Sequence, residues 1–179
     1  MNSYLWGPLT RFGVVVAAVA AALDLASKYY VLAVYDLPSR GQVAIAPFLD
    51  FVFVRNIGIS YGLFPQASAA GQWALLAIKA AAVVLLWVWL ARAGSRLTAL
   101  ALGLIIGGAL GNAADRAWHG WVTDFVLFYA ASGTWRFNWY VFNLADVAIV
   151  AGVVGLLYES LFRAPTSGAM PQNRPDRPQ

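Results

Sequence analysis

The chain has 179 residues, of which 61% are hydrophobic and only 11% are charged. A soluble domain carries about a quarter charged residues, so this composition indicates an integral membrane protein. The net charge of +4 is too small to indicate a nucleic-acid partner, and the absence of cysteine excludes a thiol nucleophile, a disulfide framework and a Cys-ligated zinc site.

Four apolar stretches are long enough to cross a bilayer, which takes about 20 helical residues. They lie at Phe12–Leu32, Gln72–Ala91, Leu97–Asp115 and Val141–Phe162. The first also has features of a cleavable signal peptide, but the apolar residues resume after Lys28, which favours a retained span. We therefore predict an all-α integral membrane protein with four transmembrane helices in a single domain, residues 1–163.

Two connections on the same side of the predicted membrane are long. In the first, Val43–Ala46 and Leu49–Val54 are β-branched and aromatic runs on either side of Pro47, which predicts short strands that end at Asn56. The second, after Arg116, contains glycines and many tryptophans and tyrosines. It predicts a turn, a short strand and an interfacial loop or helix at the level of the lipid headgroups.

The distribution of basic residues predicts the orientation. An even number of spans puts both termini on one side, and the chain ends and the second connection are basic, which indicates that this side is cytoplasmic. The arginines concerned are Arg11, Arg92, Arg96, Arg163, Arg174 and Arg177. Residues 164–179 are rich in Pro, Gly, Ser and Gln and predict a disordered tail.

Three aspartates lie in or beside the apolar segments, namely Asp115, Asp124 and Asp146. A carboxylate near a membrane core costs on the order of a few kcal/mol, so such groups usually have a function. The third span ends where the fourth begins, which puts Asp115 and Asp146 at the same depth with Asp124 between them. Two carboxylates that converge on one water are the minimum for aspartic-protease chemistry.

Other polar residues accompany these aspartates. Asn112 precedes Asp115 by three residues, and Asn143 precedes Asp146 by three, so each pair shares a helix face. Asp24 and Lys28 are four apart and form a charge pair that organises polar neighbours more readily than it does chemistry. By themselves Asn56 and Gly58 indicate an ordinary turn, and the lone His119 indicates a solvated or hydrogen-bonded loop residue.

Five motifs follow one another in the chain. They are Asp24-x-x-x-Lys28, Asn56-x-Gly58-x-x-x-Gly62, Gly108-x-x-Gly111-Asn112-x-x-Asp115-Arg116, Val122-x-Asp124-Phe125 and Phe142-Asn143-x-Ala145-Asp146. In this order, and together with four spans, they resemble the lipoprotein signal peptidase (signal peptidase II) family over almost the whole chain. Departures are small: Ser60 and Tyr61 stand where the family often has Ala-Phe, and Thr123 stands where a second Val is common.

The resemblance implies a membrane-embedded aspartic endopeptidase without metal or cofactor. Such an enzyme removes the signal peptide of bacterial prolipoproteins before the diacylglyceryl-modified cysteine, at the outer face of the cytoplasmic (inner) membrane. Carried over by motif, Asp124 and Asp146 are the expected catalytic pair. The residues expected to bind substrate or support the site are Asn56, Gly58, Asn112, Asp115, Arg116, Asn143, Asp24 and Lys28. The expected partners are the modified prolipoprotein and membrane lipid, for a multi-pass monomer that binds no nucleic acid.

Two other classes of protein are alternatives to a protease. A transporter or proton-relay subunit uses intramembrane carboxylates, and a structural subunit can contain them without using them. A small transporter or proton-relay subunit needs polar groups on both sides of the membrane midplane, whereas here they cluster toward one side. A purely structural membrane subunit leaves three clustered aspartates unexplained. Proteolysis is therefore the favoured function.

Overall fold

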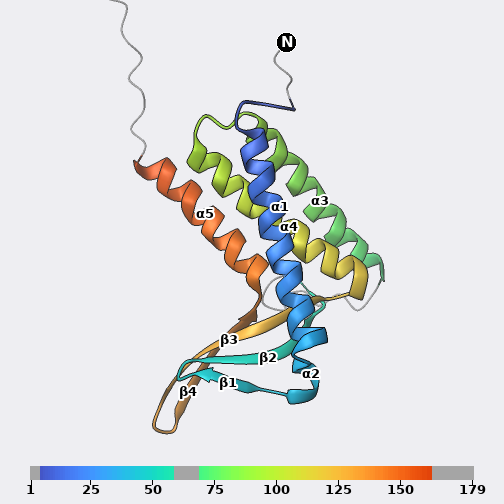
Figure 1. The fold of residues 1–179 in the computed structure, drawn as a ribbon, viewed down its shortest axis with the longest axis vertical. Coiled ribbons are helices and arrows are strands. Elements are labelled where there is room, and N and C mark those ends of the chain that lie inside the picture. Colours follow the sequence, from blue (N-terminus) through green and yellow to red (C-terminus); the bar gives the residue numbers. More distant parts are fainter. Residues whose placement is uncertain (1–4, 59–68, 163–179) are drawn as a thin grey trace, which may run out of the picture.

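The computed structural model describes residues 5–58 and 69–162. The predicted disordered tail, the departures at Ser60 and Tyr61 and the motif residue Gly62 lie outside the described residues. Figure 1 shows a bundle of helices with a small sheet at one end, while the beginning of α1 and the end of α5 lie at the opposite end.

Helix α4 (Arg96–His119) is the centre of the bundle. It packs against α1 (Thr10–Tyr29), α3 (Ala69–Ala91) and α5 (Leu144–Phe162), as Figure 1 shows. A π-helical turn, η1 (Tyr30–Val34), continues α1, and the short helix α2 (Leu37–Arg40) follows it.

Three of the described helical segments are long and apolar enough to cross a membrane. They are Thr10–Val34, Arg96–His119 and Leu144–Phe162, which correspond to the first, third and fourth predicted spans. Helix α3 occupies the place of the second, but its apolar part among the described residues, Ala80–Ala91, is shorter than a bilayer requires.

Glycines allow α4 to approach its neighbours closely. A Cβ atom added at Gly107 would lie 2.5 Å from the carbonyl oxygen of Ala17 in α1, and one added at Gly108 would lie 2.5 Å from that of Ala145 in α5. Real Cβ atoms do not come so close, so only glycine fits at these two positions. Small residues at helix contacts are the usual means of packing in membranes, where lipid tails offer no hydrophobic driving force.

The term all-α is wrong for this chain, because four antiparallel strands form a sheet. They are β1 (Val43–Ala46), β2 (Leu49–Asn56), β3 (Val122–Ser132) and β4 (Trp135–Phe142), in the spatial order β1-β2-β3-β4. The first two match the predicted strands, and β2 ends at Asn56 as predicted. The turn before β3 is made by Gly120 in the left-handed conformation (φ 83°).

The interfacial loop or helix expected after the third span is instead a β-hairpin of β3 and β4. Aromatic and polar residues alternate along Trp135–Trp139, and this period of two places the three aromatic side chains on one face of a strand. Their abundance indicated a membrane interface, but their spacing and high β propensity determine a strand.

The sheet positions two parts of the chain that are far apart in sequence. Strand β2 pairs with β3 so that Asn56 lies opposite Val122 and Val54 lies opposite Asp124. Because β3 follows α4 directly, this pairing holds the end of β2 beside the end of α4.

Candidate active site

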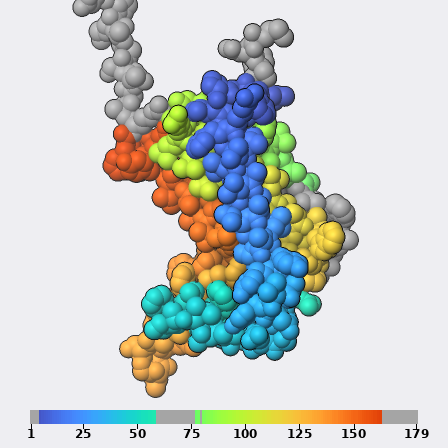
Figure 2. All heavy atoms as spheres, viewed as in Figure 1, coloured from blue at the N-terminus to red at the C-terminus, as the bar shows by residue number. Residues whose placement is uncertain are grey.

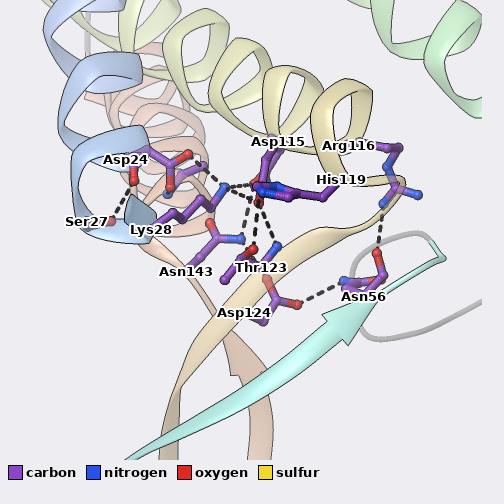
Figure 3. Close-up of polar contacts among 12 residues, drawn as sticks. Asp24, Ser27, Lys28, Asn56, Asp115, Arg116, His119, Thr123, Asp124 and Asn143 are labelled. Atoms are coloured by element: carbon purple, nitrogen blue, oxygen red, sulfur yellow. Dashed lines mark hydrogen bonds and ion pairs between the residues drawn. The ribbon is translucent and has the colours of Figure 1, made fainter. Parts of the chain in front are cut away.

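The polar residues predicted for the site meet where the sheet joins the bundle. Figure 3 shows them converging from the end of α1, the last turns of α4 and the strands β2 and β3. Several are charged or polar yet almost fully buried, namely Asp24, Lys28, Asn112, Asp115, Arg116, Asp124 and Asn143. The free-energy cost of burying so many polar groups is offset because they hydrogen-bond to one another.

Asp124 and Asp146 are both held by Asn143. The Asn143 side-chain amide donates to Oδ1 of Asp124 (2.6 Å), and its backbone N–H donates to Oδ2 of Asp146 (3.3 Å). The remaining oxygens accept from the side-chain amides of Asn56 (3.0 Å, to Asp124) and Asn112 (3.1 Å, to Asp146). Among the described residues, neither carboxylate forms an ion pair.

The start of α5 explains how the sequence places Asp146. Asn143 directly precedes the helix, and its side-chain oxygen accepts from the N–H of Asp146 (3.1 Å) while Asp146 accepts from the N–H of Asn143. This reciprocal arrangement is that of a capping box, formed here by Asn and Asp. It holds Asp146 in the first helical turn, where the helix dipole favours a carboxylate.

Asp124 lies on β3, outside the membrane-spanning helices, and burial raises its pKa to about 6. The hydrogen bond from Asn56 opposes this rise in pKa, and the nearby negative charge of Asp146 adds to it. Burial penalises the charged form, so Asp124 holds a proton at a pH where an ordinary aspartate has lost it.

Lys28 neutralises a different pair of carboxylates. Its ammonium donates to Oδ2 of Asp24 (2.8 Å) and to the side-chain oxygen of Asn112 (2.8 Å), and it lies 3.5 Å from Oδ2 of Asp115. Asp24 also accepts from the backbone N–H of Ala145 in α5 (2.9 Å). The Asp24–Lys28 pair therefore joins α1 to α4 and α5, and within the described residues its hydrogen bonds lead to Asp146 through Asn112.

Arg116 holds the turn that follows β2. Its guanidinium donates to the backbone carbonyls of Gly58 (2.7 Å), Asn56 (3.3 Å) and Ile57 (3.3 Å). The Asn56 side-chain oxygen accepts from the N–H of Gly58 (3.1 Å), which leaves its amide NH₂ directed at Asp124. The turn that the sequence indicates is thus fastened to α4 and orients a hydrogen-bond donor.

Asp115 binds the residue that precedes Asp124 in the chain. Its Oδ2 accepts from the backbone N–H of Thr123 (2.7 Å), and its Oδ1 lies 2.7 Å from Nδ1 of His119. His119 was interpreted as a loop residue, but it ends α4 one turn after Asp115. Its spacing of four from Asp115 on one helix was the signal that predicts this contact.

Aromatic stacking extends from His119 back to β2. The His119 ring stacks on Trp121 with centroids 5.5 Å apart, and the Arg55 guanidinium lies 4.5 Å from the centroid of Trp121. Arg55 directly precedes Asn56, so the stack gives the end of β2 a second attachment to the end of α4. No motif or spacing in the chain predicts these contacts, because they depend on the pairing of β2 with β3.

A cavity of about 500 Å³ lies between α4 and the segment formed by α1 and η1, and Lys28 and Asp115 are among its lining residues. Leu25, Leu32 and Ala33 form apolar walls, and His119 lies at its polar end. Within the part of the chain that the structure describes, no three His, Cys, Asp or Glu side chains are grouped so as to hold a metal ion.

Comparisons with known proteins agree on one family. Residues 16–162 match the family model described as signal peptidase (SPase) II. The chain is 54% identical to the lipoprotein signal peptidase of Nitrobacter hamburgensis, over 89% of this chain and 97% of that protein. It is 55% identical to that of Methylorubrum extorquens, over 87% of this chain and 88% of the relative.

The fold also resembles that of a solved bacterial membrane enzyme. The TM-score is 0.67 with 21% sequence identity, over 90% of this chain and 99% of the other. A second structure of a bacterial membrane enzyme matches with a TM-score of 0.66. At this identity the likeness concerns the fold alone.

Proposed function

Because the chain belongs to the lipoprotein signal peptidase (signal peptidase II) family, we propose that Asp124 and Asp146 are the catalytic pair with which this membrane protease removes signal peptides from prolipoproteins. The observation that carries the proposal is that Asn143 hydrogen-bonds to both carboxylates. The Lys28 ammonium instead contacts Asp24, Asn112 and Asp115, and it forms no ion pair with either member of the pair. The transporter and structural-subunit alternatives are set aside.

The two carboxylates have different environments, which suggests different roles. Asp124 is the protonated member, because burial raises its pKa. Asp146, in the first turn of α5 where the helix dipole favours a carboxylate, acts as the general base. Two like charges that share one site cannot both ionise cheaply, so the pair holds one proton between them.

Hydrolysis then follows with protons conserved. Asp146 takes a proton from a water molecule while the oxygen of that water bonds to the scissile carbonyl carbon. Asp124 gives its proton to the carbonyl oxygen. The resulting tetrahedral diol collapses when Asp146 returns a proton to the leaving nitrogen and Asp124 recovers one from a hydroxyl. The C–N bond breaks, which releases the signal peptide acid and the amine of the modified cysteine.

The pH dependence of cleavage tests this pairing. We expect kcat/KM to fall as the pH rises through the pKa of Asp124, near 6 in the free enzyme, because the protonated form is required. The hydrogen bond from Asn56 lowers this pKa, so Asn56→Ala should move the falling limb to higher pH. Gln42→Ala, which removes an amide that donates to Asp50 instead, is the matched control and should leave the limb in place. An unmoved limb in Asn56→Ala would contradict the role of Asp124.

His119 is expected to act through Asp115. His119→Ala removes the hydrogen bond at Nδ1 and should lower the free energy of unfolding by about 1.5–3 kcal/mol, the size of one hydrogen bond to a charged group. His119→Asn places an amide N–H near the position of Nδ1 and should restore most of the stability, whereas His119→Gln should not. The measurement is the melting temperature in detergent, with kcat of the folded enzyme, which should stay close to the native value, alongside. Equal losses in the Asn and Ala variants would refute the contact.

We place the protein in the bacterial cytoplasmic (inner) membrane with four spans, α3 included, cytoplasmic termini and the active site near the outer face. The site and sheet lie at one end of the bundle, and the beginning of α1 and the end of α5 lie at the other (Figure 1). The arginines near the chain ends and around the α3–α4 connection support this orientation.

Cysteine labelling tests the orientation cleanly, because the native chain contains no cysteine. Ser132→Cys at the exposed hairpin tip should react with an impermeant maleimide in intact spheroplasts. Arg92→Cys, exposed in the α3–α4 connection, should react only after the membrane is permeabilised. The reverse result would invert the topology.

A further inference from the structure

The cavity of about 500 Å³ beside α4 is lined by neither Asp124 nor Asp146. Its volume is in the usual range for small-molecule sites. All its lining residues belong to the spans Thr10–Val34 and Arg96–His119, in the halves that lie toward the sheet. Figure 2 shows the end of α1 (blue) beside the end of α4 (yellow) at the surface of the molecule. The cavity therefore borders the bilayer, at the level where acyl chains meet the headgroups.

One wall of the cavity is formed by a π-helical turn. In η1 the backbone N–H of Tyr35 donates to the carbonyl of Tyr30 (2.8 Å), five residues back. Leu32 and Ala33 in this turn line the cavity, while Val31 is 3% exposed and packs in the core beneath the sheet. Single π-helical turns are rare and occur frequently at functional sites. The turn gives the cavity an apolar wall at its outer end.

His119 gives the cavity a hydrogen-bond acceptor. Nδ1 of its ring lies 2.7 Å from Oδ1 of Asp115, and because a carboxylate can only accept, Nδ1 carries the proton. In the neutral ring Nε2 is then an acceptor, on a lining side chain that is 33% exposed. The other two ionisable side chains of the lining, Lys28 and Asp115, carry opposite charges, so the lining does not favour an anion. A ligand that fits this end is one without net charge that donates a hydrogen bond.

Two exposed aromatic side chains mark the mouth of the cavity. Tyr29 is 68% exposed and Trp118 is 85% exposed, one on α1 and the other on α4. Amphipathic rings of this kind prefer the headgroup level of the membrane. Their faces also attract an ammonium group, tryptophan most strongly. The mouth therefore suits a cationic group at the membrane surface.

We propose that this cavity binds a bilayer phospholipid with an ethanolamine headgroup. One acyl chain lies along the apolar walls, which Leu25, two helical turns before Leu32, extends toward the bilayer core. The ammonium lies at the mouth and donates to Nε2 of His119. Such a lipid is zwitterionic, so it matches a lining without net charge, and it supplies both the chain and the donor.

Other lipids fit the cavity less well. A choline headgroup has the positive charge but no N–H to donate, and an anionic headgroup brings a net charge that the lining does not compensate. The diacylglyceryl group of the substrate has no free hydroxyl, because its glycerol carbons carry two esters and the thioether. It fits the apolar walls but leaves the acceptor of His119 without a partner.

The test measures lipid binding to the full-length enzyme in detergent by native mass spectrometry. The probes are dioleoyl lipids with ethanolamine, choline or glycerol headgroups, which have the same acyl chains. We expect one ethanolamine lipid to bind about tenfold more tightly than either of the others, the size of one hydrogen bond to a charged group. Equal affinities for the three lipids would overturn the proposal.

Filling the cavity gives the matched comparison on the enzyme. Ala114 and Ala117 are both exposed on α4, but only Ala114 lines the cavity. Ala114→Phe should remove the bound lipid, as should Ala33→Phe from the opposite wall, whereas Ala117→Phe should retain it. Because a ligand stabilises the fold that binds it, ethanolamine lipid should raise the melting temperature of the native protein and of Ala117→Phe only. Retention of the lipid by both cavity-filling variants would refute this site.

The headgroup contact has its own variant. His119→Asn keeps an N–H for Asp115 but has no atom at the position of Nε2, so it should bind ethanolamine and choline lipids equally. A retained preference for ethanolamine would contradict the contact with His119.

A competition experiment separates this lipid from the substrate. Diacylglyceryl-modified peptide is added to Asp124→Asn enzyme that carries the ethanolamine lipid, and the lipid should stay bound. Its displacement by the peptide would assign the cavity to the substrate and overturn the proposal. Since no step depends on turnover, failure here is distinct from failure of the catalytic pair.

Discussion

We expect Asp124→Asn and Asp146→Asn each to abolish cleavage of a diacylglyceryl-modified prolipoprotein while the protein stays folded. Each substitution is nearly isosteric and keeps hydrogen-bonding capacity toward the amides of Asn56, Asn112 and Asn143, but it removes the group that exchanges a proton. The expected loss of turnover is on the order of 10³-fold, within the range for an acid–base catalyst.

Stability should move in the opposite direction at Asp124. Its pKa is raised in the folded protein, so ionisation of this side chain destabilises the fold as the pH rises from about 4 through about 6. Asparagine cannot ionise, and Asp124→Asn should therefore melt no lower than the native protein at pH 8. The measurement is turnover per folded molecule in detergent, with melting curves at pH 5 and pH 8.

A matched control is Asp36→Asn, the same substitution at an exposed position on the sheet side. Asp36 has φ 51°, a left-handed conformation that asparagine also accepts. This variant should cleave at the native rate. Native turnover by purified, folded Asp124→Asn or Asp146→Asn would contradict the assignment of the pair.

We expect Asp115→Asn to lower stability strongly and to affect catalysis only as far as the protein unfolds. Asp115 accepts hydrogen bonds from Thr123 and His119 and lies beside the ammonium of Lys28. Removing one charge of a buried, paired network costs on the order of 3 kcal/mol, because its partners stay buried with less compensation. The melting temperature should therefore drop by several degrees.

The critical readout is activity normalised to folded enzyme. We expect Asp115→Asn to retain most of it, in contrast to Asp124→Asn measured alongside. A fully folded but inactive Asp115→Asn, together with an active Asp124→Asn, would mean that the pair is Asp115 with Asp146.

Local spacing was sufficient for much of the fold. The apolar lengths predicted the spans that α1, α4 and α5 now occupy, and proline between β-branched runs predicted β1 and β2 with the end at Asn56. The Asn143-x-x-Asp146 spacing, read as one helix face, lies at the start of α5. Each of these features depends on residues within one or two turns of one another.

The β3–β4 hairpin shows where composition misled. Tryptophan and tyrosine are common both at membrane interfaces and in strands, so their number alone did not decide between the two. Alternation of aromatic residues with Arg136 and Asn138 along Trp135–Trp139 indicates a strand, and pairing with β3 across Gly133 forms it. The spacing of four between Asp115 and His119 is that of a contact on one helix. His119 was predicted as a loop residue because a lone histidine near Gly120 does not by itself indicate that the helix continues to it.

The sequence by itself determined the membrane class, the family and the set of polar residues, because motifs and apolar lengths are local. Only the tertiary structure decided how those residues are partnered. Packing of α4 between α1 and α5 gives the Lys28 ammonium to Asp24, Asn112 and Asp115, while the β2–β3 register brings Asn56 to Asp124. The four carboxylates thus acquire different surroundings, because a cation stabilises most strongly the charges closest to it. Asp24 and Asp115 lie beside the Lys28 ammonium, whereas Asp124 and Asp146 accept hydrogen bonds from neutral amides.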